Sequence, residues 1–277
     1  MKRMELSFFK MQGAGNDYVF MDCRQTGYAF VPEELAVRIS RRRFSVGSDG
    51  LVLILPSVVA DVRMRMFNAD GSEGAMCGNA IRCLGKYLYE RCGMENRILT
   101  VETKSGIRRL HLSPEKQGVQ VSVEMGRAVV QPPRLLPFTS GMREVVPVSV
   151  GNPHAVTFVP DTEALVLERL GPETEKHPAF PGGVNAEFVT VKDRRTLQMR
   201  VWERGSGETL ACGTGACAAV AAACCSGVCE RDILVSVLLP GGRLSVCCDA
   251  EGFVSLSGDA VWVYEGVYTD AAADSHS

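Results

Sequence analysis

Two stretches of the chain carry the same pattern of apolar and polar positions, which predicts a strand, a loop of small residues and a helix. In the later stretch, residues 199–202 alternate apolar and polar side chains, as a half-buried strand does. Residues 216–223 then place small apolar side chains on one helical face, and Gly227 follows as a natural stop for the helix. Cys212 falls where the loop becomes the helix.

The earlier stretch, residues 64–81, aligns with the later one at a constant offset of 135 positions. Cys77 corresponds to Cys212, and a glycine follows each cysteine. The helix after Cys77 also has an apolar face and reaches a glycine, Gly93. The chain therefore presents a strand, a loop and a cysteine at a helix start twice.

Other parts of the chain repeat in the same order, which indicates a tandem duplication. Strands are predicted at residues 6–11, 18–22, 51–55, 99–102, 108–112, 119–123, 145–150 and 261–268. Helices are predicted at residues 32–42 and 163–170, and Pro132 and Pro133 indicate a linker. We expect an N-terminal half over 1–128 and a C-terminal half over 129–261, with the segment 262–277 returning to the first half and its small, polar end, 271–277, frayed.

The order of elements also indicates the class of fold. Each half is rich in strands and has one long helix, so we expect an α+β (mixed α/β) fold of two similar halves. If the halves pack about a pseudo-twofold axis, Cys77 and Cys212 flank one cleft together with two helix N-termini.

Composition narrows the class of protein. The 277 residues are 46% hydrophobic and 22% charged, as in a globular protein, and the net charge of −2 provides no basic field for nucleic acid or an anionic membrane. No export signal and no segment long enough to span a bilayer is visible. Eleven cysteines, an odd number in a chain of this length, favour free thiols in the cytoplasm over a disulfide framework.

The position of the two cysteines predicts acid–base chemistry. Each would lie beside the backbone N–H groups and the positive dipole end of a helix, which lowers a thiol pKa from about 8.5 to roughly 3.5–7.5, so Cys212 is a candidate thiolate. Two such helix starts also bind an anion such as a carboxylate. A thiolate on one side of a carbon and a thiol on the other can remove a proton and return one to the opposite face. The pair therefore predicts inversion of a stereocentre.

Polar residues in repeat-related loops are candidates for substrate binding. Four asparagines at strand-to-loop transitions could bind carboxylate and ammonium groups: Asn16, Asn68, Asn152 and Asn185. Glu203 and Arg204 could bind an ammonium and a carboxylate, or could form a surface ion pair. His154 is either a loop histidine satisfied by its neighbours or a group that tunes a nearby thiol. These residues predict a zwitterionic substrate.

Several other sites are disfavoured. Cysteines 83, 92, 217, 224, 225, 229, 247 and 248 are assigned to packing. No Cys-x-x-Cys pair occurs and histidines are few, so we expect no metal site. The Gly-x-Gly pairs complete no dinucleotide fingerprint, and the basic run at residues 41–43 is interpreted as a solvated face or as cations near a helix end.

The motifs at residues 10–17, 67–73, 77–83, 151–154 and 203–215 resemble those of the diaminopimelate epimerase family, and the resemblance covers nearly the whole chain. It implies interconversion of LL- and meso-diaminopimelate for lysine and peptidoglycan synthesis, without a cofactor, in a homodimer. It also implies a mostly antiparallel sheet wrapped around a central helix in each half.

The resemblance implies a role for each candidate residue. Cys77 and Cys212 would be the base and acid, and His154 with Glu203 would adjust the pKa of the thiols. The α-carboxylate would be held at the helix starts by Gly78, Asn79, Gly213 and Thr214. The remaining substrate contacts would come from Asn16, Asn68, Asn152, Asn185, Glu203 and Arg204.

Two positions depart from the family pattern. Many relatives have a glycine where Ser45 stands, and some carry a substrate-contacting glutamine where this chain has Gly50. A missing side chain at Gly50 would leave room, so relaxed specificity, such as glutamate racemization, is one alternative. A covalent enzyme that uses one cysteine and His154 is a second. A non-catalytic amino-acid-binding protein is a third.

Overall fold

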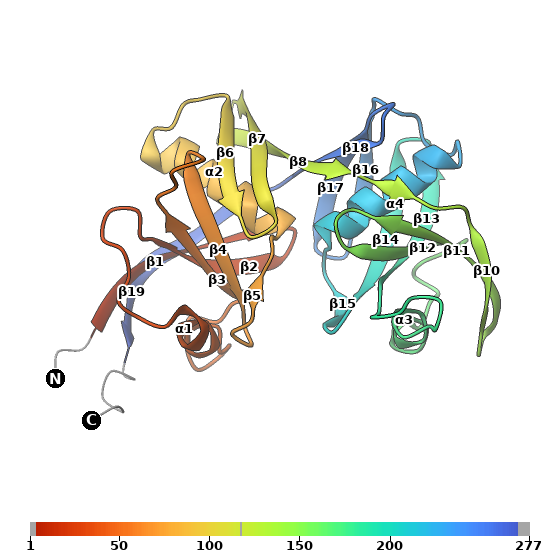
Figure 1. Ribbon diagram of the computed structural model, residues 1–277, viewed down its shortest axis with the longest axis horizontal. Helices are drawn as coiled ribbons and strands as arrows, with labels where there is room; N and C mark the ends of the chain where they lie inside the picture. The colour runs from red at the N-terminus through yellow and green to blue at the C-terminus, as the bar shows by residue number, and fades with distance from the viewer. Residues whose placement is uncertain (1–3, 117, 271–277) are drawn as a thin grey trace. The chain divides into compact units, whose positions relative to one another are not determined.

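The computed structural model describes residues 4–116 and 118–270 and divides into two compact units (Figure 1). Unit 1 takes residues 1–121 and 260–277, and unit 2 takes residues 122–259. The terminal segment expected to fray, residues 271–277, lies outside the described residues. No helix within the described ranges combines the length and the hydropathy needed to cross a membrane.

Unit 1 is a sheet with two helices. Its elements are β1 (Met4–Gly13), β2 (Asn16–Asp22), α1 (Pro32–Ile39), β3 (Gly50–Leu55), β4 (Val62–Asn68), β5 (Glu73–Gly74), α2 (Gly78–Cys92), β6 (Ile98–Thr103), β7 (Gly106–Glu115) and β19 (Val261–Asp270), and β8 (Gly118–Arg127) crosses the boundary at residue 121. β1 pairs antiparallel with β2 and with β19. β2 is parallel to β3 and β4 is parallel to β6, whereas β3–β4 and β6–β7 are antiparallel.

Unit 2 repeats this arrangement. Its elements are β9 (Val129–Val130), β10 (Arg134–Phe138), β11 (Gly141–Ser149), β12 (Pro153–Phe158), α3 (Leu167–Glu175), β13 (Asn185–Asp193), β14 (Thr196–Glu203), β15 (Gly207–Thr209), α4 (Gly213–Cys225), β16 (Leu234–Leu239), β17 (Gly242–Cys248) and β18 (Phe253–Gly258). β12 is parallel to β13 and β14 is parallel to β16, with antiparallel neighbours β13–β14 and β16–β17. The duplication in the sequence therefore extends to strand order and strand direction, and the expected mixed fold of two similar halves is confirmed.

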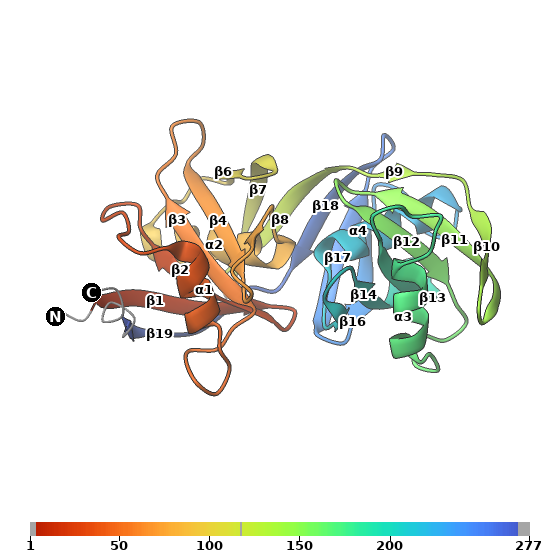
Figure 2. The ribbon, with the colours of Figure 1, turned by 60° about the horizontal axis from the view of Figure 1, so that its bottom comes forward.

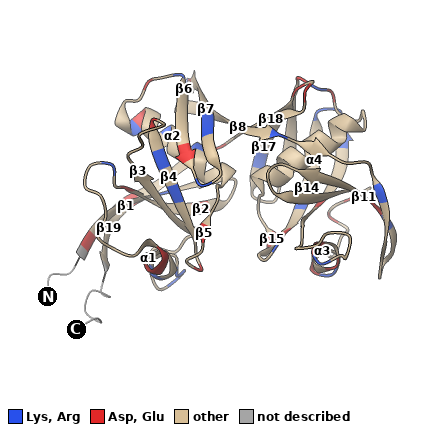
Figure 3. Cartoon of the chain, viewed as in Figure 1, with Lys and Arg blue, Asp and Glu red and all other residues tan. Residues whose placement is uncertain are grey.

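The helix that follows each cysteine packs against its own unit's sheet (Figure 2). In α4 every residue is buried except Thr214 and Cys225, and the helix carries no charge (Figure 3). The sequence predicts one apolar face for α4, but the buried surface extends around the whole helix. Its alanines leave room for strands on several sides, so the helix lies inside the unit.

Both helices begin at their cysteines, as predicted. Cys77 and Cys212 are N-cap residues with extended backbones, at φ/ψ of −123°/123° and −125°/113°. α2 ends at Cys92 with Gly93, at φ +66°, as its C-cap, and α4 ends at Cys225 with Ser226 as its C-cap and Gly227, at φ +73°, after it. Glycine adopts these positive φ values without steric cost, so it stops each helix.

Two shorter helices differ from the prediction. α1 ends at Ile39 rather than at residue 42, because the chain turns back and Gly47 N–H donates to the Ile39 carbonyl. The helix predicted over 163–170 starts only at Leu167. Arg200 on β14 donates to the carbonyls of Thr162 and Leu165, and these bonds hold that segment as a turn.

Candidate active site

In unit 1, the start of α2 lies against the end of the β1–β2 hairpin. The Cys77 thiol donates to Asn16 Oδ1 at 3.3 Å, and Asn79 Nδ2 donates to the same oxygen at 3.4 Å. Asn16 Nδ2 donates to Asp49 Oδ2 at 2.7 Å. Because a carboxylate only accepts, Asp49 fixes the amide orientation and turns its oxygen toward the Cys77 sulfur.

A charged network holds Asp49 in place. Asp49 accepts from the backbone N–H of Asp17 at 2.9 Å and from Arg42 Nη2 at 2.9 Å. Lys10 Nζ lies 2.7 Å from Asp17 Oδ2, and Arg42 also pairs with Asp17. Burial raises the pKa of Asp17, but the hydrogen bonds from Arg42 and Lys10 outweigh it and lower the pKa. Arg42 is exposed, as predicted for this basic run, and its guanidinium group also pairs with both carboxylates of this network.

Tyr18 is a contact of Cys77 that the sequence analysis missed. Its side chain is buried on β2 and hydrogen bonds with the Cys77 thiol. Burial, the Cys77 charge and the Asp49 charge raise the pKa of Tyr18 well above its ordinary value. The tyrosine therefore keeps its proton and can donate it in a hydrogen bond to the sulfur. Tyr18 lies two residues after Asn16 on the same strand, and this spacing is the sequence feature that could have predicted its contact with Cys77.

Two further candidates in unit 1 are placed less directly. Asn68 ends β4, and its Nδ2 donates to Ser72 Oγ at 2.9 Å within the turn that follows. Gly78 is the buried first residue of α2. The unit thus brings Cys77, Asn16 and Asn79 together, while Asn68 bonds within its own turn.

In unit 2, Cys212 accepts hydrogen bonds from α4. The Gly215 N–H donates to its sulfur at 3.4 Å, and Thr214 Oγ1 lies 3.5 Å from it. Asn152 Nδ2 donates to Thr214 Oγ1 at 3.3 Å, so the threonine hydrogen is available to Cys212. His154 Nε2 lies 3.0 Å from Asn152 Oδ1. Four sequence-predicted residues, Asn152, His154, Cys212 and Thr214, therefore form one chain of contacts.

A buried acid completes this chain and was missed by the sequence analysis. Since Asn152 Oδ1 can only accept, His154 Nε2 carries hydrogen, and His154 Nδ1 lies 2.6 Å from Glu187 Oε1. Both side chains are fully buried. Burial raises the pKa of Glu187, although the charge of His154 opposes this. A glutamate among the apolar residues at the start of β13 is the sequence feature that could have predicted this buried acid.

The charge state of Cys212 differs from the expectation of a helix-end thiolate. Burial raises the pKa of Cys212 well above the ordinary thiol value, and the charges of Glu203 and Glu187 raise it further. Hydrogen bonds from Thr214 and Gly215 oppose these effects without cancelling them. Desolvation disfavours the charged form of a buried group, and here it outweighs the helix dipole. The free protein therefore holds Cys212 as a thiol.

The remaining residues of unit 2 cluster around the β12–β13 pairing, in which Asn185 lies opposite His154. Asn185 Nδ2 donates to the Pro153 carbonyl, and its Oδ1 accepts from the Arg204 backbone N–H at 2.9 Å. The Arg204 side chain is exposed and donates to the Gly182 carbonyl. Glu203 accepts from Thr209 at 2.5 Å, and Gly213 is the buried first residue of α4.

Gly50 is not a vacated side-chain position. A Cβ atom added there would lie 2.1 Å from the Phe67 carbonyl oxygen and 3.0 Å from the Tyr18 ring. The room that the sequence analysis expected at this residue is filled by the backbone of β4. Gly50 therefore provides no reason to expect a relaxed substrate specificity.

Each unit of the duplicated fold carries a cysteine at the start of a packed helix. Solved structures share this fold. The chain resembles a hydroxyproline epimerase from Agrobacterium vitis, solved with bound trans-4-hydroxy-L-proline (TM-score 0.73, 14% identity, covering 96% of this chain and 92% of that one). It also resembles a PhzF-family phenazine biosynthesis protein from Bacillus anthracis (TM-score 0.74, 21% identity, 98% and 100%).

Sequence relatives identify the family. The family model for diaminopimelate epimerase matches residues 8–131 and 146–263. Diaminopimelate epimerases from Acetivibrio thermocellus and Desulfovibrio desulfuricans are 47% and 48% identical, over 94% and 95% of this chain and 98% of each relative. The chain belongs to the diaminopimelate epimerase family and is an epimerase.

Proposed function

We propose that this chain interconverts LL- and meso-diaminopimelate by general acid–base catalysis with two thiols and no cofactor. The observation that carries the proposal is the N-cap cysteine of a packed helix in each duplicated unit. The relationship to diaminopimelate epimerases over nearly the full length supports the choice of substrate. The reaction would supply precursors for the synthesis of lysine and peptidoglycan.

The helix starts suit the α-carboxylate of the substrate. The first N–H groups of a helix lack partners within the helix and carry its positive dipole end. Gly78 and Asn79 provide these groups in unit 1, and Gly213 and Thr214 provide them in unit 2. A carboxylate held there can accept the negative charge that develops on the α-carbon, because the helix N–H groups stabilise it. The α-proton therefore becomes easier to remove.

Each thiol would work from one face of the α-carbon. Burial and the charges of Glu203 and Glu187 favour the protonated form of Cys212, so we infer that Cys212 enters as the proton donor. Cys77 would then take the α-proton as the base, with the Tyr18 hydroxyl as a donor to its sulfur. The bond to the α-proton breaks on one face while Cys212 delivers its proton to the other. The reverse reaction starts with the roles exchanged.

The other polar residues would position the thiols and the substrate. Asp49 fixes Asn16, which accepts from the Cys77 thiol. His154 fixes Asn152, which donates to the Thr214 hydroxyl beside the Cys212 sulfur. Asn68, Asn185, Glu203 and Arg204 would contact the charged groups at the distal end of diaminopimelate. His154 and Glu203 would also set the pKa of Cys212.

The test is proton exchange in D₂O with the reduced protein. The wild type should invert LL-diaminopimelate and incorporate deuterium at the α-carbon. Cys77→Ala and Cys212→Ala should each lower the rate of inversion by about 10³-fold, since each removes one proton-transfer group. Cys225→Ala is a matched control, because Cys225 lies at the opposite end of the helix that starts after Cys212.

Other outcomes would favour other functions. Inversion that needs only one cysteine, with a covalent adduct detected by mass spectrometry, would indicate the one-thiol enzyme. Binding without exchange would indicate a non-catalytic binding protein. Exchange on L-glutamate as well as diaminopimelate would indicate relaxed specificity.

We also propose that the protein acts in the cytoplasm as a homodimer. The family resemblance supports the dimer, and the eleven cysteines support a reducing compartment. Light scattering coupled to size-exclusion chromatography tests the dimer, and a mass equal to one chain of 30.0 kDa would contradict it.

A further inference from the structure

Arg82 is a buried cation in the second turn of α2. Among the lysines and arginines of the described residues it alone is buried, with 0% of its surface exposed. A guanidinium group stays charged in proteins, and burial of a charge near the positive end of a helix dipole is unfavourable. A side chain that is kept at such a cost to stability points to a role other than packing.

The guanidinium group of Arg82 reaches back to the first turn of α2. Its Nη1 donates to the Gly78 carbonyl at 3.0 Å, and its Nη2 donates to Asn79 Oδ1 at 2.8 Å. Side chains on a helix lean toward the helix N-terminus, so a residue four positions on can reach the first carbonyl. Because a guanidinium group only donates, it fixes the Asn79 amide with Nδ2 directed at Asn16 Oδ1.

The bond to the Gly78 carbonyl affects one particular N–H group. The Gly78 carbonyl and the Asn79 N–H belong to the same planar peptide group. A cation at the carbonyl oxygen polarises that peptide group and makes its N–H a stronger donor, because successive hydrogen bonds polarise one another. The Asn79 N–H is one of the groups proposed to hold the α-carboxylate. The charge of Arg82 therefore reaches the carboxylate site through a single peptide group.

The equivalent helix of unit 2 lacks this charge. At the offset of 135 residues, the buried Cys217 takes the place of Arg82, and α4 carries no charged residue. The charges that raise the pKa of Cys212 are negative, from Glu203 and Glu187. The duplication therefore repeats the helix start but not its charge, so α2 offers a carboxylate a buried cation and α4 does not.

We propose that Arg82 is a positioning residue for the α-carboxylate, and that its charge acts through the Gly78–Asn79 peptide group to strengthen carboxylate binding at the start of α2. This role rests on the proposed function, in which the helix start holds the carboxylate. Removal of the α-proton moves negative charge onto the carboxylate oxygens, so a cation near them stabilises the transition state more than the bound substrate. Arg82 should therefore affect kcat more than KM.

The test compares alkylation of Cys77 by iodoacetate and by iodoacetamide in the reduced full-length protein, followed by peptide mapping with mass spectrometry. With both reagents the Cys77 thiolate displaces iodide, but only iodoacetate carries a carboxylate on the reacting carbon. At one pH, the ratio of the two rates therefore reports carboxylate binding and does not depend on how much thiolate is present. In the wild type this ratio should exceed that of a small free thiol such as glutathione.

Two variants separate the charge of Arg82 from its hydrogen bonds. Arg82→Gln keeps a donor but loses the charge, and it should lower the iodoacetate preference of Cys77 about five-fold, because a bond to a charged group is weakened. Arg82→Lys keeps the charge, and its ratio should stay within about two-fold of the wild type. In Arg82→Gln, kcat for inversion of LL-diaminopimelate should fall about ten-fold, with a smaller change in KM.

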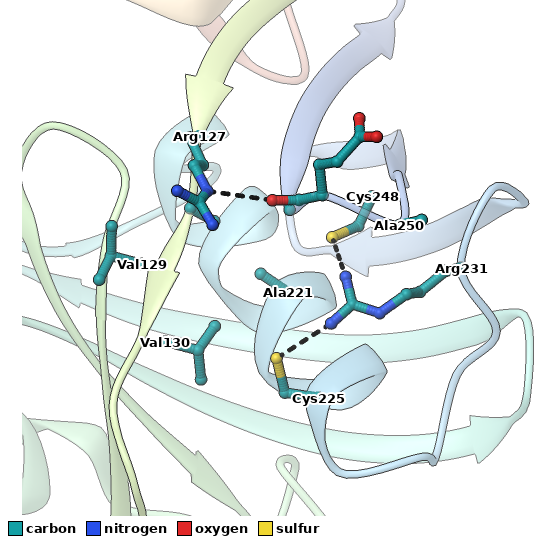
Figure 4. A pocket seen from close by; sticks show the side chains of 11 residues that line it. Arg127, Val129, Val130, Ala221, Cys225, Arg231, Cys248 and Ala250 are labelled. Atoms are coloured by element: carbon teal, nitrogen blue, oxygen red, sulfur yellow. Dashed lines mark hydrogen bonds between the residues drawn. The ribbon is translucent and has the colours of Figure 1, made fainter.

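Two controls accompany these variants. Lys86→Met removes another cation of α2, one turn after Arg82, where Lys86 pairs with Glu90 at 3.6 Å, and it should leave the ratio at Cys77 unchanged. Cys225 is an internal control. The sequence analysis assigned it to packing, but it is exposed, and its sulfur lies 3.3 Å from the Arg231 guanidinium group beside a pocket of unit 2 (Figure 4). Its own ratio should be the same in every variant.

The outcomes distinguish this role from the proposed function. If Arg82→Gln slows both reagents equally at Cys77, Arg82 is only a structural residue and the proposal is overturned, even when the wild type inverts diaminopimelate. A five-fold loss of the ratio in Arg82→Lys, or a wild-type ratio no higher than that of glutathione, would also overturn it. If the ratio falls in Arg82→Gln as expected but the wild type inverts no diaminopimelate, the carboxylate site stands and the proposed reaction fails.

Discussion

At the scale of single residues, the two candidate catalytic cysteines have the same place in their helices but different surroundings. Each is an N-cap with an extended backbone and a glycine after it. Cys77 donates to Asn16 and contacts Tyr18, whereas Cys212 is buried and its pKa is raised by two acids, Glu203 and Glu187. The motif is repeated, but the electrostatics are not. A two-thiol reaction needs such a difference, because one sulfur must hold the proton that the other lacks.

We expect the negative charge of Glu203 to be a main determinant of the pKa of Cys212. In Glu203→Gln the negative charge is lost while an oxygen remains to accept from Thr209. The pKa of Cys212 should fall, because its thiolate no longer faces that charge. Alkylation of Cys212 requires the thiolate, so its pH profile should move to lower pH, as followed by mass spectrometry.

A matched control for this variant is Glu208→Gln. Glu208 lies on the neighbouring β15, where its carboxylate pairs with the Arg200 guanidinium. Its replacement should leave the alkylation profile of Cys212 unchanged. An unshifted profile in Glu203→Gln would show that Glu203 does not set the charge state of Cys212.

At the scale of elements, β3 must begin with a residue that has no side chain. Gly50 pairs with Asn68 on β4, and the Phe67 carbonyl occupies the space where a Cβ would go. Closely packed backbones leave no slack for an added atom. This fit fixes the pairing of β3 with β4. Gly50 also lies opposite Tyr18 in the parallel pairing of β2 with β3, so the fit helps to position the tyrosine that contacts Cys77.

Gly50→Ala should therefore destabilise the protein. The added methyl group must displace the β4 backbone, and we expect a loss of about 3 kcal/mol in the free energy of unfolding. Urea unfolding followed by circular dichroism measures this loss. Gly93→Ala is the control, because Gly93 has open space around it and only its φ of +66° costs about 1 kcal/mol. Equal losses in the two variants would contradict the argument from space.

At the scale of the whole molecule, a segment from the end of the chain completes unit 1. β19 pairs with β1 along its length, although more than 240 residues of chain lie between them. Trp262 stacks on Phe9 with ring centroids 5.0 Å apart, and the Arg91 guanidinium lies 4.6 Å from its ring. Unit 1 therefore depends on the last strand for part of its core.

Trp262→Ala should weaken unit 1. Loss of a half-buried aromatic ring at this contact should cost about 2–3 kcal/mol of unfolding free energy. Hydrogen exchange should show the loss in β1 and α2, because Phe9 and Arg91 belong to these elements. Val263→Ala, on the adjacent and more exposed position of β19, should cost less than about 1 kcal/mol. Equal protection of β1 in both variants would contradict this role.

The sequence by itself determined the features that depend on local spacing. The 135-residue offset, the strand before each cysteine and the helices that end near Gly93 and Gly227 could all be predicted, because periodicity and capping are properties of neighbouring residues. The family motifs also identified the candidate residues. The helix predicted at 163–170 failed because a distant arginine, Arg200, holds its first residues in a turn.

Only the tertiary structure decided the properties that depend on distant residues. The raised pKa of Cys212 and the filled space at Gly50 each bring together residues from separate elements. Burial and Coulomb interactions are sums over all neighbouring atoms, whichever part of the chain supplies them. A motif can therefore place a thiol at a helix start, but the surrounding strands determine whether that thiol carries a charge.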